Sequence, residues 1–574
     1  MVLVGLAALA PARAAAPPPS ARLSPAEVTA AALAADTSPL LARLLLPEEH
    51  AGDALVFEAG GDEDEEAKAA DRPDAARDFR AKSLRDEKGR IPADGMTRAV
   101  AQINAMQARQ KTAGRISAAG ITPGQWKWDG PGNIGGRVRA LVFPPLHPDW
   151  MLAGTASGGV WLNKNDGSGW QPRGIIAPNL PVNALAADPT QPERIYAGTG
   201  ESFEATNPPP DKSILNDSRD VMRGDGIWVS NDSGLSWTQL PATRYAANGA
   251  FNFVNRIAVL TATAVLSVPT ILAATSTGLL FSQNNGASWQ RADWDLGQIT
   301  DPVFDIRVHP ILSATHAIAA GHHRIYRTQD SGATWAEVPG IPAAAGRIEL
   351  SYAPSNPLTV YASIDYAAVA PAPPNEKWKG ELWKSTDGGA TFAPANTNTY
   401  FLQTQGHYDN ALWVDPTNDG RLIVGGIDLF RSLDGGRTLQ KISDWKANAS
   451  GLDSAHADQH AIVAEPRYNG TSFRTVYAAG DGGIFANDQQ FAPVANVPLL
   501  AWDKSPGQEF TITQFYAASG GTKPVTTVIA GAQDNGVAQY FPDTGVWRKI
   551  GGGDGGYTAV DTDNTNDLFM EYVN

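Results

Sequence analysis

Short apolar segments alternate with glycine- and aspartate-rich turns along the chain from about residue 126 onwards. Each segment suits a β-strand and is too short for a helix. The segments recur in units: an apolar strand ending near Asp-Pro, a strand such as IYAG, a third strand, a polar turn and a closing strand. We expect the opening strands at Arg137–Phe143, Val182–Asp188, Val254–Leu260, Val303–His309, Arg347–Ala353, Asn410–Asp415, Gln459–Glu465, Gln514–Ala518 and Tyr557–Asp561.

The polar turn has a repeated sequence of its own, of which SNDSGLSW at Ser230–Trp237 is a clear copy. Its Asp can accept hydrogen bonds from the turn's backbone, and its Gly supplies a positive φ. We therefore expect Asp232, Asp330, Asp387 and Asp434 to stabilise hairpins at the outer edge and not to catalyse. The other copies are SQNNGASW at Ser282–Trp289, TQDSGATW at Thr328–Trp335, STDGGATF at Ser385–Phe392, SLDGGRTL at Ser432–Leu439 and a degraded NKNDGSGW at Asn163–Trp170.

Units of four short strands at a spacing of roughly 35 to 70 residues are typical of β-propeller blades. The sequence predicts an all-β fold, a β-propeller array of about eight to nine four-stranded blades over residues 121–574, possibly in two rings. The last blade would have only its first two strands. Either the chain is a fragment of a longer protein, which we favour, or Trp126–Trp128 completes that blade. Insertions at Glu201–Asp225 and Ala367–Gly380 are either binding-face loops or surface excursions.

The region before the propeller has a different composition. Residues 1–16 resemble a secretory signal peptide, with an apolar stretch at Val2–Ala10 and a small-residue cleavage site at Ala12–Ala14. Residues 17–120 are predicted to be a helical or disordered leader, with a helix expected at Met96–Gln110. These features predict a protein that is secreted, periplasmic or on the cell surface.

Composition narrows the possible partners. The net charge of −15 argues against nucleic acid, because the chain has no basic patch. The chain has no cysteine, which rules out disulfides and thiolate metal sites, and no apolar segment is long enough to span a membrane. A glycan or an extracellular protein remains as the expected partner.

Polar motifs gather where the inner strands of the last blades begin, the usual place for a ligand site at the mouth of a propeller channel. They are GHYDN at Gly406–Asn410, HADQH at His456–His460, GDGG at Gly480–Gly483, GAQDNG at Gly531–Gly536 and GGGDGG at Gly551–Gly556. The ligand-binding candidates are His407, Asp409, His456, Asp458, His460, Asp481, Gln533, Asp534, Asn535 and Asp554. The catalytic candidates among them are Asp458, Asp534 and Asp554, although Asp residues next to Gly can also simply cap turns.

His456, Asp458 and His460 alternate, so on a strand they would share one face. Two imidazoles and a carboxylate could hold a divalent metal or act as an acid/base cluster. A hydrogen-bonded polar plug in the channel wall is the simpler interpretation, and we expect no cofactor. Arg137 and Arg139 also alternate, and Arg256, Arg307 and Arg347 lie on or beside later inner strands. Such arginines could bind a substrate carboxylate.

The repeated turn resembles the Asp-box, or bacterial neuraminidase repeat, of sialidase-type and sortilin-type propellers. The segments GPGNIGGRVRAL, YAGTGE, HADQHA, GDGGIF, GAQDNG and GGDGGY resemble large secreted bacterial proteins of the glycosyl hydrolase BNR-repeat kind. The chain is also similar to xyloglucan-cleaving glycoside hydrolases, in which the Asp of an R-T-D-x-G-G motif is thought to be the catalytic base. The matching stretch here is GTASGG, with Ala156 at the position of that Asp.

Two hypotheses follow. The first is a secreted propeller that recognises a glycan or protein ligand at its channel mouth, and Ala156 favours it. The alternative is a glycoside hydrolase, sialidase-like or xyloglucanase-like, that uses paired carboxylates. Enzymatic activity is therefore open at this point.

Overall fold

The computed structural model describes residues 85–89, parts of 98–109, and 130–572 with gaps at 174–179, 203–221, 245–246, 264–265, 296, 367–379, 404, 450–452, 493–501, 505–509, 522–526, 562–563 and 565. The chain divides into two units, residues 1–70 and 71–574. The expected signal peptide, Trp126–Trp128 and most of both insertions lie outside the described residues. The described residues between 98 and 109 are helical.

Nearly all of the second unit is β-structure, as predicted, in antiparallel sheets whose strands are mostly in chain order. The first three sheets contain β1 Val138–Val142, β2 Met151–Thr155, β3 Gly159–Asn163 and β4 Trp170–Pro172; β5 Val182–Ala187, β6 Ile195–Thr199, β7 Ile227–Ser230 and β8 Thr238–Gln239; β9 Val254–Leu260, β10 Thr270–Thr275, β11 Gly278–Ser282 and β12 Gln290–Arg291. The fourth contains β15 Val303–Val308, β16 Ala317–Gly321, β17 Ile325–Thr328 and β18 Thr334–Glu337, extended by β13 Asp293–Trp294 and β14 Gly297–Gln298.

The next sheets follow the same order along the chain. They contain β19 Ala345–Tyr352, β20 Val360–Tyr366, β21 Glu381–Ser385 and β22 Ala393–Asn396; β23 Ala411–Val414, β24 Leu422–Gly425, β25 Leu429–Ser432 and β26 Gln440–Lys441; β27 Gln459–Ala464, β28 Val476–Gly480, β29 Gly483–Asn487 and β30 Asp503–Lys504. The helical elements are short: η3 Pro241–Thr243, η4 Gly249–Phe251 and α5 Trp445–Ala449. No helix in the described part of the chain is both long enough and apolar enough to cross a membrane.

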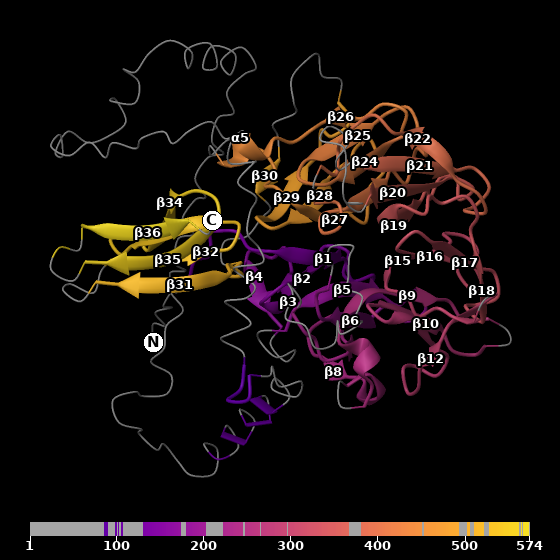
Figure 1. Cartoon of the computed structure of the whole chain (residues 1–574), viewed down its shortest axis with the longest axis horizontal. Helices are drawn as coiled ribbons and strands as arrows, with labels where there is room; N and C mark the ends of the chain where they lie inside the picture. Colours follow the sequence, from indigo (N-terminus) through magenta and orange to yellow (C-terminus); the bar gives the residue numbers. More distant parts are fainter. Residues whose placement is uncertain are drawn as a thin grey trace, which may run out of the picture. The chain divides into compact units, whose positions relative to one another are not determined.

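The first seven sheets close into a ring. The first strand of each sheet packs against the first strand of the next sheet, in the order β1, β5, β9, β15, β19, β23 and β27. Strand β27 then packs against β1. Figure 1 shows the succession from purple β1 to orange β30. Each of these seven sheets is built from one continuous stretch of chain, so the described residues close the ring by packing and not by a shared strand.

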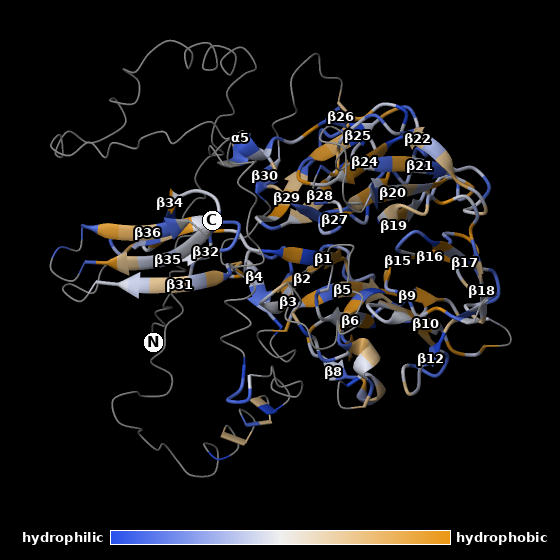
Figure 2. Ribbon diagram, in the orientation of Figure 1, coloured by the Kyte–Doolittle hydropathy of each residue, from blue (hydrophilic) through white to orange (hydrophobic). Residues whose placement is uncertain are grey.

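One apolar cluster fills each junction between neighbouring sheets. Tyr196 and Ile271, for example, belong to the cluster between the second and third sheets. Val138 and Ile484 belong to the cluster that joins the first sheet to the seventh. The strongly hydrophobic residues lie mostly on the strands (Figure 2). Burial of these faces is the main force that holds the sheets together, because a single sheet cannot cover its own apolar faces.

Two further sheets follow the ring. One contains β31 Phe515–Gly520, β32 Val528–Ala532, β33 Gly536–Phe541 and β34 Val546–Gly551, and the other contains β35 Gly555–Val560 and β36 Leu568–Tyr572. β35 packs on β31 and β32. The segment before β1 joins the eighth sheet to the ring, because Asn133 Nδ2 donates to the Trp547 carbonyl at 2.7 Å and Ile134 packs on Trp547.

Each opening strand expected from the sequence coincides with the first strand of a sheet, to within a few residues at either end. In most of them the pairing register shifts near the start, which leaves one or two extra residues in the inner strand. Side chains normally alternate between the two faces of a strand, and a bulge of this kind points the extra side chain in another direction. The buried polar residues placed in this way are Arg139, Asn183, Asn255, Arg347 and His460.

Candidate functional site

Arg137, at the start of the first inner strand, joins the ring to the eighth sheet. Its Nε and Nη2 donate to the two carboxylate oxygens of Asp481 at 2.9 and 3.1 Å, and Nη2 also donates to Asp534 Oδ2 at 2.9 Å. Asp481 follows β28, whereas Asp534 lies at the tip of the β32–β33 hairpin. The Arg137 and Asp481 side chains are only 7% and 2% exposed, and Asp534 is 21% exposed. Asp534 is therefore the member of this group that a solute can reach.

Tyr408 lies between two arginines in the same region. The guanidinium carbons of Arg137 and Arg139 are 5.1 and 4.9 Å from the centre of its ring, which is cation–π geometry. The Tyr408 hydroxyl donates to Glu201 Oε1 at 2.8 Å. Glu201 in turn lies 3.7 Å from Arg137 Nη1 and 3.4 Å from Arg139 Nε. A buried carboxylate, a phenol and two guanidinium groups therefore compensate one another.

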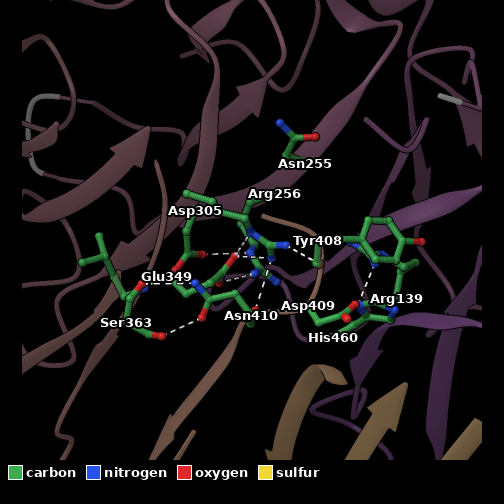
Figure 3. Close-up of polar contacts among 12 residues, drawn as sticks. Arg139, Asn255, Arg256, Asp305, Glu349, Ser363, Tyr408, Asp409, Asn410 and His460 are labelled. Carbon is green, nitrogen blue, oxygen red and sulfur yellow. Dashed lines mark hydrogen bonds and ion pairs between the residues drawn. The ribbon is translucent and has the colours of Figure 1, made fainter. Parts of the chain in front are cut away.

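His460 links this group to the seventh sheet. Its Nε2 lies 2.5 Å from Asp481 Oδ1, and its Nδ1 lies 2.7 Å from Arg139 Nη1 (Figure 3 shows the Arg139 contact). Because the arginine can only donate, Nδ1 must accept and Nε2 must carry the proton. Burial, and then the charge of Arg139, lower the pKa of His460 to about 4. The imidazole is thus neutral at physiological pH and serves as a hydrogen-bond bridge.

Four carboxyl groups, Asp409, Asp458, Asp481 and Asp534, form what we call the carboxylate cluster. The ligand oxygens of Asp458, Asp481 and Asp534 all lie within 4.8 Å of one another. Gln405 Nε2 donates to Asp409 Oδ2 at 3.0 Å and to Asp458 Oδ1 at 2.9 Å, which joins the fourth member to the other three. Asp458 and Asp534 both have left-handed backbones, with φ of 67° and 59°. Such conformations are costly for residues other than glycine and gather at functional sites.

The pKa values of the four carboxyl groups in the carboxylate cluster are shifted in different directions. Burial alone would raise the pKa of Asp481, but Arg137 and then His460 lower it far below its usual value. Burial, and then the charge of Asp481, raise the pKa of Asp409 to about 8. Burial also raises the pKa values of Asp458 and Asp534 well above normal, and a neighbouring carboxylate raises each further. One ionised carboxylate therefore lies among carboxyl groups that keep their protons.

Three converging carboxyl groups suggest a divalent cation, but Arg137 already fills that role. Its guanidinium bonds to both Asp481 and Asp534 and supplies the positive charge that a metal would bring. The metal site considered at His456, Asp458 and His460 is not formed. Strand β27 begins only at Gln459, so the three residues do not alternate along a strand face.

Three other predicted ligand residues, Asn535, Asp554 and His456, lie in turns and loops around Asp534. Asn535 Nδ2 donates to the Asp481 and Gln533 carbonyls at 3.1 and 3.0 Å. Asp554 Oδ1 accepts from the Asp534 backbone N–H at 2.6 Å. His456 Nε2 lies 3.1 Å from the Asp534 carbonyl. These contacts position Asp534 against the ring.

Two predicted ligand residues take little part in the cluster. Gln533 is half-buried, and its amide oxygen has no hydrogen-bond partner among the described residues. His407 contributes its backbone carbonyl, which lies 3.5 Å from Arg347 Nη1. Of the predicted ligand residues, the structure brings Asp409, Asp458, Asp481 and Asp534 together and leaves Gln533 and His407 outside that group.

The later arginines form a belt of their own farther round the ring, as Figure 3 shows for Arg256, Asp305 and Glu349. Arg256 bonds to Asp305 and to Glu349, each at 2.9 Å, and Arg347 Nη2 bonds to Glu349 at 2.7 Å. Arg307 Nε lies 2.8 Å from Asp305. The expectation of an arginine group free to bind a substrate carboxylate is therefore wrong here, because protein carboxylates already neutralise these arginines.

The repeated turns share one hydrogen-bond pattern. In the fifth sheet, Ser385 Oγ donates to Asp387 Oδ1 at 2.7 Å and accepts from the Gly389 N–H at 2.9 Å, while Thr391 Oγ1 donates to Asp387 Oδ2 at 2.6 Å. Equivalent bonds surround Asp232, Asp330 and Asp434. Hydrogen bonds from Thr391 and Ser385, which outweigh the effect of burial, lower the pKa of Asp387 to about 2.

Comparison with known proteins gives a consistent but distant picture. No family model matches the chain. A xyloglucanase of Paenibacillus sp is 26% identical over 392 residues, which cover 57% of this chain and 33% of the relative. An oligoxyloglucan-reducing end-specific xyloglucanase of Emericella nidulans is 24% identical over 355 residues, 54% of this chain and 40% of the relative. The chain thus spans well under half the length of these relatives.

Among solved structures, the GH74 xyloglucanase from Xanthomonas campestris matches with a TM-score of 0.50 at 16% identity, over 76% of this chain and 72% of that one. An ancestral GH74 enzyme also gives 0.50, at 17% identity over 75% and 57% of the two chains. The relatives named here are xyloglucanases and not sialidases or sortilins. At these identities the structural matches show the fold alone, and that fold is an all-β, propeller-like array of four-stranded antiparallel sheets.

Proposed function

We propose that the chain is a carbohydrate-active propeller that hydrolyses glycosidic bonds of a polysaccharide of the xyloglucan type. Its named sequence relatives are xyloglucanases, and the matches cover more than half of this chain. This inverts the preference taken from the sequence, in which recognition without hydrolysis came first. We also propose that the first seven sheets are Asp-box blades of one propeller, that the last two sheets begin a second, and that the domain starts near residue 121 after a secretory leader.

The observation that carries the proposal is the position of Asp534, which is 21% exposed and is joined through Arg137 to the deeply buried Asp481. A glycosidase needs a carboxylic acid that is still protonated at neutral pH, and a neighbouring negative charge together with partial burial provides one. Asp534 has both features and is 21% exposed. We assign Asp534 as the general acid, and Asp458, half-buried and within 4.8 Å of it, as the second carboxyl group, which must release its proton before it can act as nucleophile or base.

The separation of the two carboxyl groups bears on the mechanism. Inverting enzymes keep their pair about 6.5–9.5 Å apart and retaining enzymes about 5–5.5 Å apart. The oxygens of Asp458 and Asp534 lie within 4.8 Å, nearer the retaining spacing. The buried Ala156 offers no carboxylate where the resemblance to xyloglucan-cleaving enzymes would have one. A hydrolase built on this chain would therefore use carboxyl groups other than the R-T-D-x-G-G Asp.

Two observations favour a second candidate, glycan recognition without hydrolysis. Ala156 removes one expected catalytic group, and Arg137 holds both Asp481 and Asp534 by hydrogen bonds. In that case the cluster would bind sugar hydroxyls by hydrogen bonds and cleave nothing.

A hydrolysis assay of the full chain on xyloglucan and other polysaccharides tests the proposal, with reducing ends as the readout and affinity electrophoresis in the same gels. We expect turnover that Asp534→Asn and Asp458→Asn abolish and that Asp387→Asn, in an outer turn, leaves unchanged. Turnover that survives in both cluster variants would refute the assignment. Glycan retardation without turnover would establish the second candidate.

A further inference from the structure

Two lysines lie along the hairpins that carry the central carboxylates. Asp481 lies in the β28–β29 turn and Asp534 in the β32–β33 turn, and each turn ends on a glycine with positive φ, Gly483 and Gly536. A Cβ at Gly483 would lie 3.9 Å from Cε of Lys504, and one at Gly536 would lie 2.8 Å from Cε of Lys549. Each lysine comes from the fourth strand of the same sheet as its turn, so the two sheets repeat one arrangement.

The two positive charges act on each other and on His456. Both side chains reach solvent, although surrounding protein displaces part of their hydration. This loss of hydration, and then the charge of Lys549, lower the pKa of Lys504 to about 8. The pKa of His456 is lowered first by burial, and both lysines lower it further. The contacts agree, because Asn535 Nδ2 donates to the Asp481 carbonyl at 3.1 Å and joins the two hairpins, and His456 Nε2 lies 3.1 Å from the Asp534 carbonyl.

No described carboxylate forms an ion pair with either lysine. Lys504 Nζ donates to the Asn133 carbonyl at 3.1 Å, a neutral acceptor. By contrast, Lys441 on the fourth strand of the sixth sheet has a carboxylate partner, Asp428, at 2.9 Å. Two neighbouring lysines without a counter-charge repel each other, and an anion placed between them would remove that repulsion.

We propose that Lys504 and Lys549, beside His456, form an anion subsite next to the carboxylate cluster, which takes the acidic group of a glycan. That group is a carboxylate of a uronic-acid residue or a sulfate ester. The inference rests on the proposed glycan site and extends its substrate class from neutral xyloglucan-type chains to polysaccharides that carry acidic groups. A neutral chain would leave both ammonium groups uncompensated, whereas an acidic one would pair with them while its sugar ring lies at Asp534.

A purely structural role for the lysines would look different. In the third sheet, Arg291 lies beside Gly278 and its Nη1 donates to the Thr277 carbonyl, which caps that hairpin. Lys504 instead bonds outside its own hairpin, to the segment before β1, and among the described contacts Lys549 donates no hydrogen bond to its hairpin. The two lysines therefore lie where Arg291 lies in the third sheet, but in the described part of the chain they do not make the hydrogen bond to their own hairpin that Arg291 makes.

Titration calorimetry on the full chain tests the subsite with three probes: an oligogalacturonate, a sulfated galactan oligosaccharide and a neutral xyloglucan oligosaccharide. We expect the wild type to bind at least one acidic probe, and the Lys504→Gln/Lys549→Gln double variant to lose about tenfold or more of that affinity. Binding of the neutral probe should be unchanged by the double variant. Added salt should weaken only the acidic probe.

Arg548→Gln is the control for the Lys549 half of the double variant, because it removes one positive charge from the same strand. Its guanidinium lies over the Phe541 ring at 4.7 Å, and it alternates with Lys549 along β34. An equal loss in Arg548→Gln would overturn the subsite in favour of general surface charge. Failure of both acidic probes to bind the wild type, or unchanged binding in the double variant, would overturn it as well.

The two acidic probes are titrated in separate experiments. The probe that binds therefore shows whether the subsite takes a uronic-acid carboxylate or a sulfate ester. The outcomes also separate this inference from the proposed function. Acidic binding that depends on the lysines, without turnover of any glycan, would support the subsite and reject the hydrolase. Turnover lost in Asp534→Asn but unaffected by the double variant on every acidic substrate would support the hydrolase and reject the subsite.

Discussion

The Tyr408 hydroxyl donates a hydrogen bond to the buried carboxylate of Glu201 at 2.8 Å, across 207 residues of sequence. Glu201 follows the second strand of the second sheet, and Tyr408 precedes the sixth sheet, so the bond spans the inside of the ring. Arg137 and Arg139 stack on the Tyr408 ring. This single side chain therefore ties the sixth sheet to the first and second, next to the carboxylate cluster.

Replacing Tyr408 by Phe should destabilise the protein without collapsing the site. The substitution removes the donor to Glu201 but keeps the ring between the two guanidinium groups. A buried acceptor left without its donor typically costs about 1–3 kcal/mol. We expect a loss of that size in urea unfolding, and a larger loss for Tyr408→Ala. An unchanged midpoint in Tyr408→Phe would mean that water replaces the phenol.

Arg137→Gln should cost more, because it leaves buried carboxylates without their cation. Breaking a buried ion pair from one side costs about 3–5 kcal/mol. The pKa of Asp481 is lowered in the fold, so its contribution to stability is present above the unfolded pKa of about 3.9 and is lost as pH falls further. The difference between wild type and variant in urea unfolding should therefore shrink below about pH 4.

The exposed pair of Arg324 and Asp301 provides the control for that experiment. The two side chains are 34% and 61% exposed, and exposed pairs contribute about 0–1 kcal/mol. Arg324→Gln should therefore change little at any pH. If Arg324→Gln destabilised the protein as much as Arg137→Gln, the larger cost expected for the buried ion pair of Arg137 would be contradicted.

Asp409→Asn should stabilise the protein at neutral pH. The pKa of Asp409 is raised to about 8, so the folded chain holds a proton that the unfolded chain releases above about pH 4. Its contribution to stability is full below that value and is lost as pH rises towards 8, at up to about 1.4 kcal/mol per pH unit. Asparagine mimics the protonated acid at all pH values. The advantage of the variant should grow between about pH 5 and pH 8, and a constant difference would contradict the assignment.

The strands were predictable because their signals are local. Val254–Leu260 is a short, mostly apolar segment of the length of a buried strand, and the turn at Ser282–Trp289 carries its own Asn, Gly and hydroxyl residues. Closure of the ring after seven sheets was not predictable from such signals. It depends on Ile484 meeting Val138 across the whole length of the ring, and every opening strand in the chain looks alike.

The site was found only in part, for a similar reason. Asp481 was recognisable because it lies between glycines in a turn, and Asp534 because glycines bound its turn at Gly531 and Gly536. Tyr408 and Glu201 had no local signal beyond an aromatic in GHYDN and an acid after YAGTG, and their roles arise from contact across the ring. His456, Asp458 and His460 do not share one face of a strand as their alternation suggested. Asp458 has a left-handed backbone, with φ 67°, and strand β27 begins only after it, at Gln459.

Ser385→Ala should affect stability and leave the site alone. The hydroxyl of this buried serine donates to Asp387 and accepts from the Gly389 N–H, so its removal leaves a turn N–H without a partner. We expect a loss of about 1–2 kcal/mol in urea unfolding with unchanged glycan turnover or binding. A selective loss of turnover at unchanged stability would show that the outer turns take part in function.

Asp554→Asn should move the pH profile of any glycan hydrolysis without abolishing it. The pKa of Asp534 is raised first by burial and then by Asp481, and the charge of Asp554 raises it further. Asparagine keeps the Oδ1 acceptor for the Asp534 N–H but removes that charge. The general acid should then lose its proton at a lower pH, and the alkaline limb of kcat/KM should shift down by roughly one unit or less. A variant inactive at every pH would instead make Asp554 a catalytic group in its own right, and Asp534 would lose its assignment as the acid.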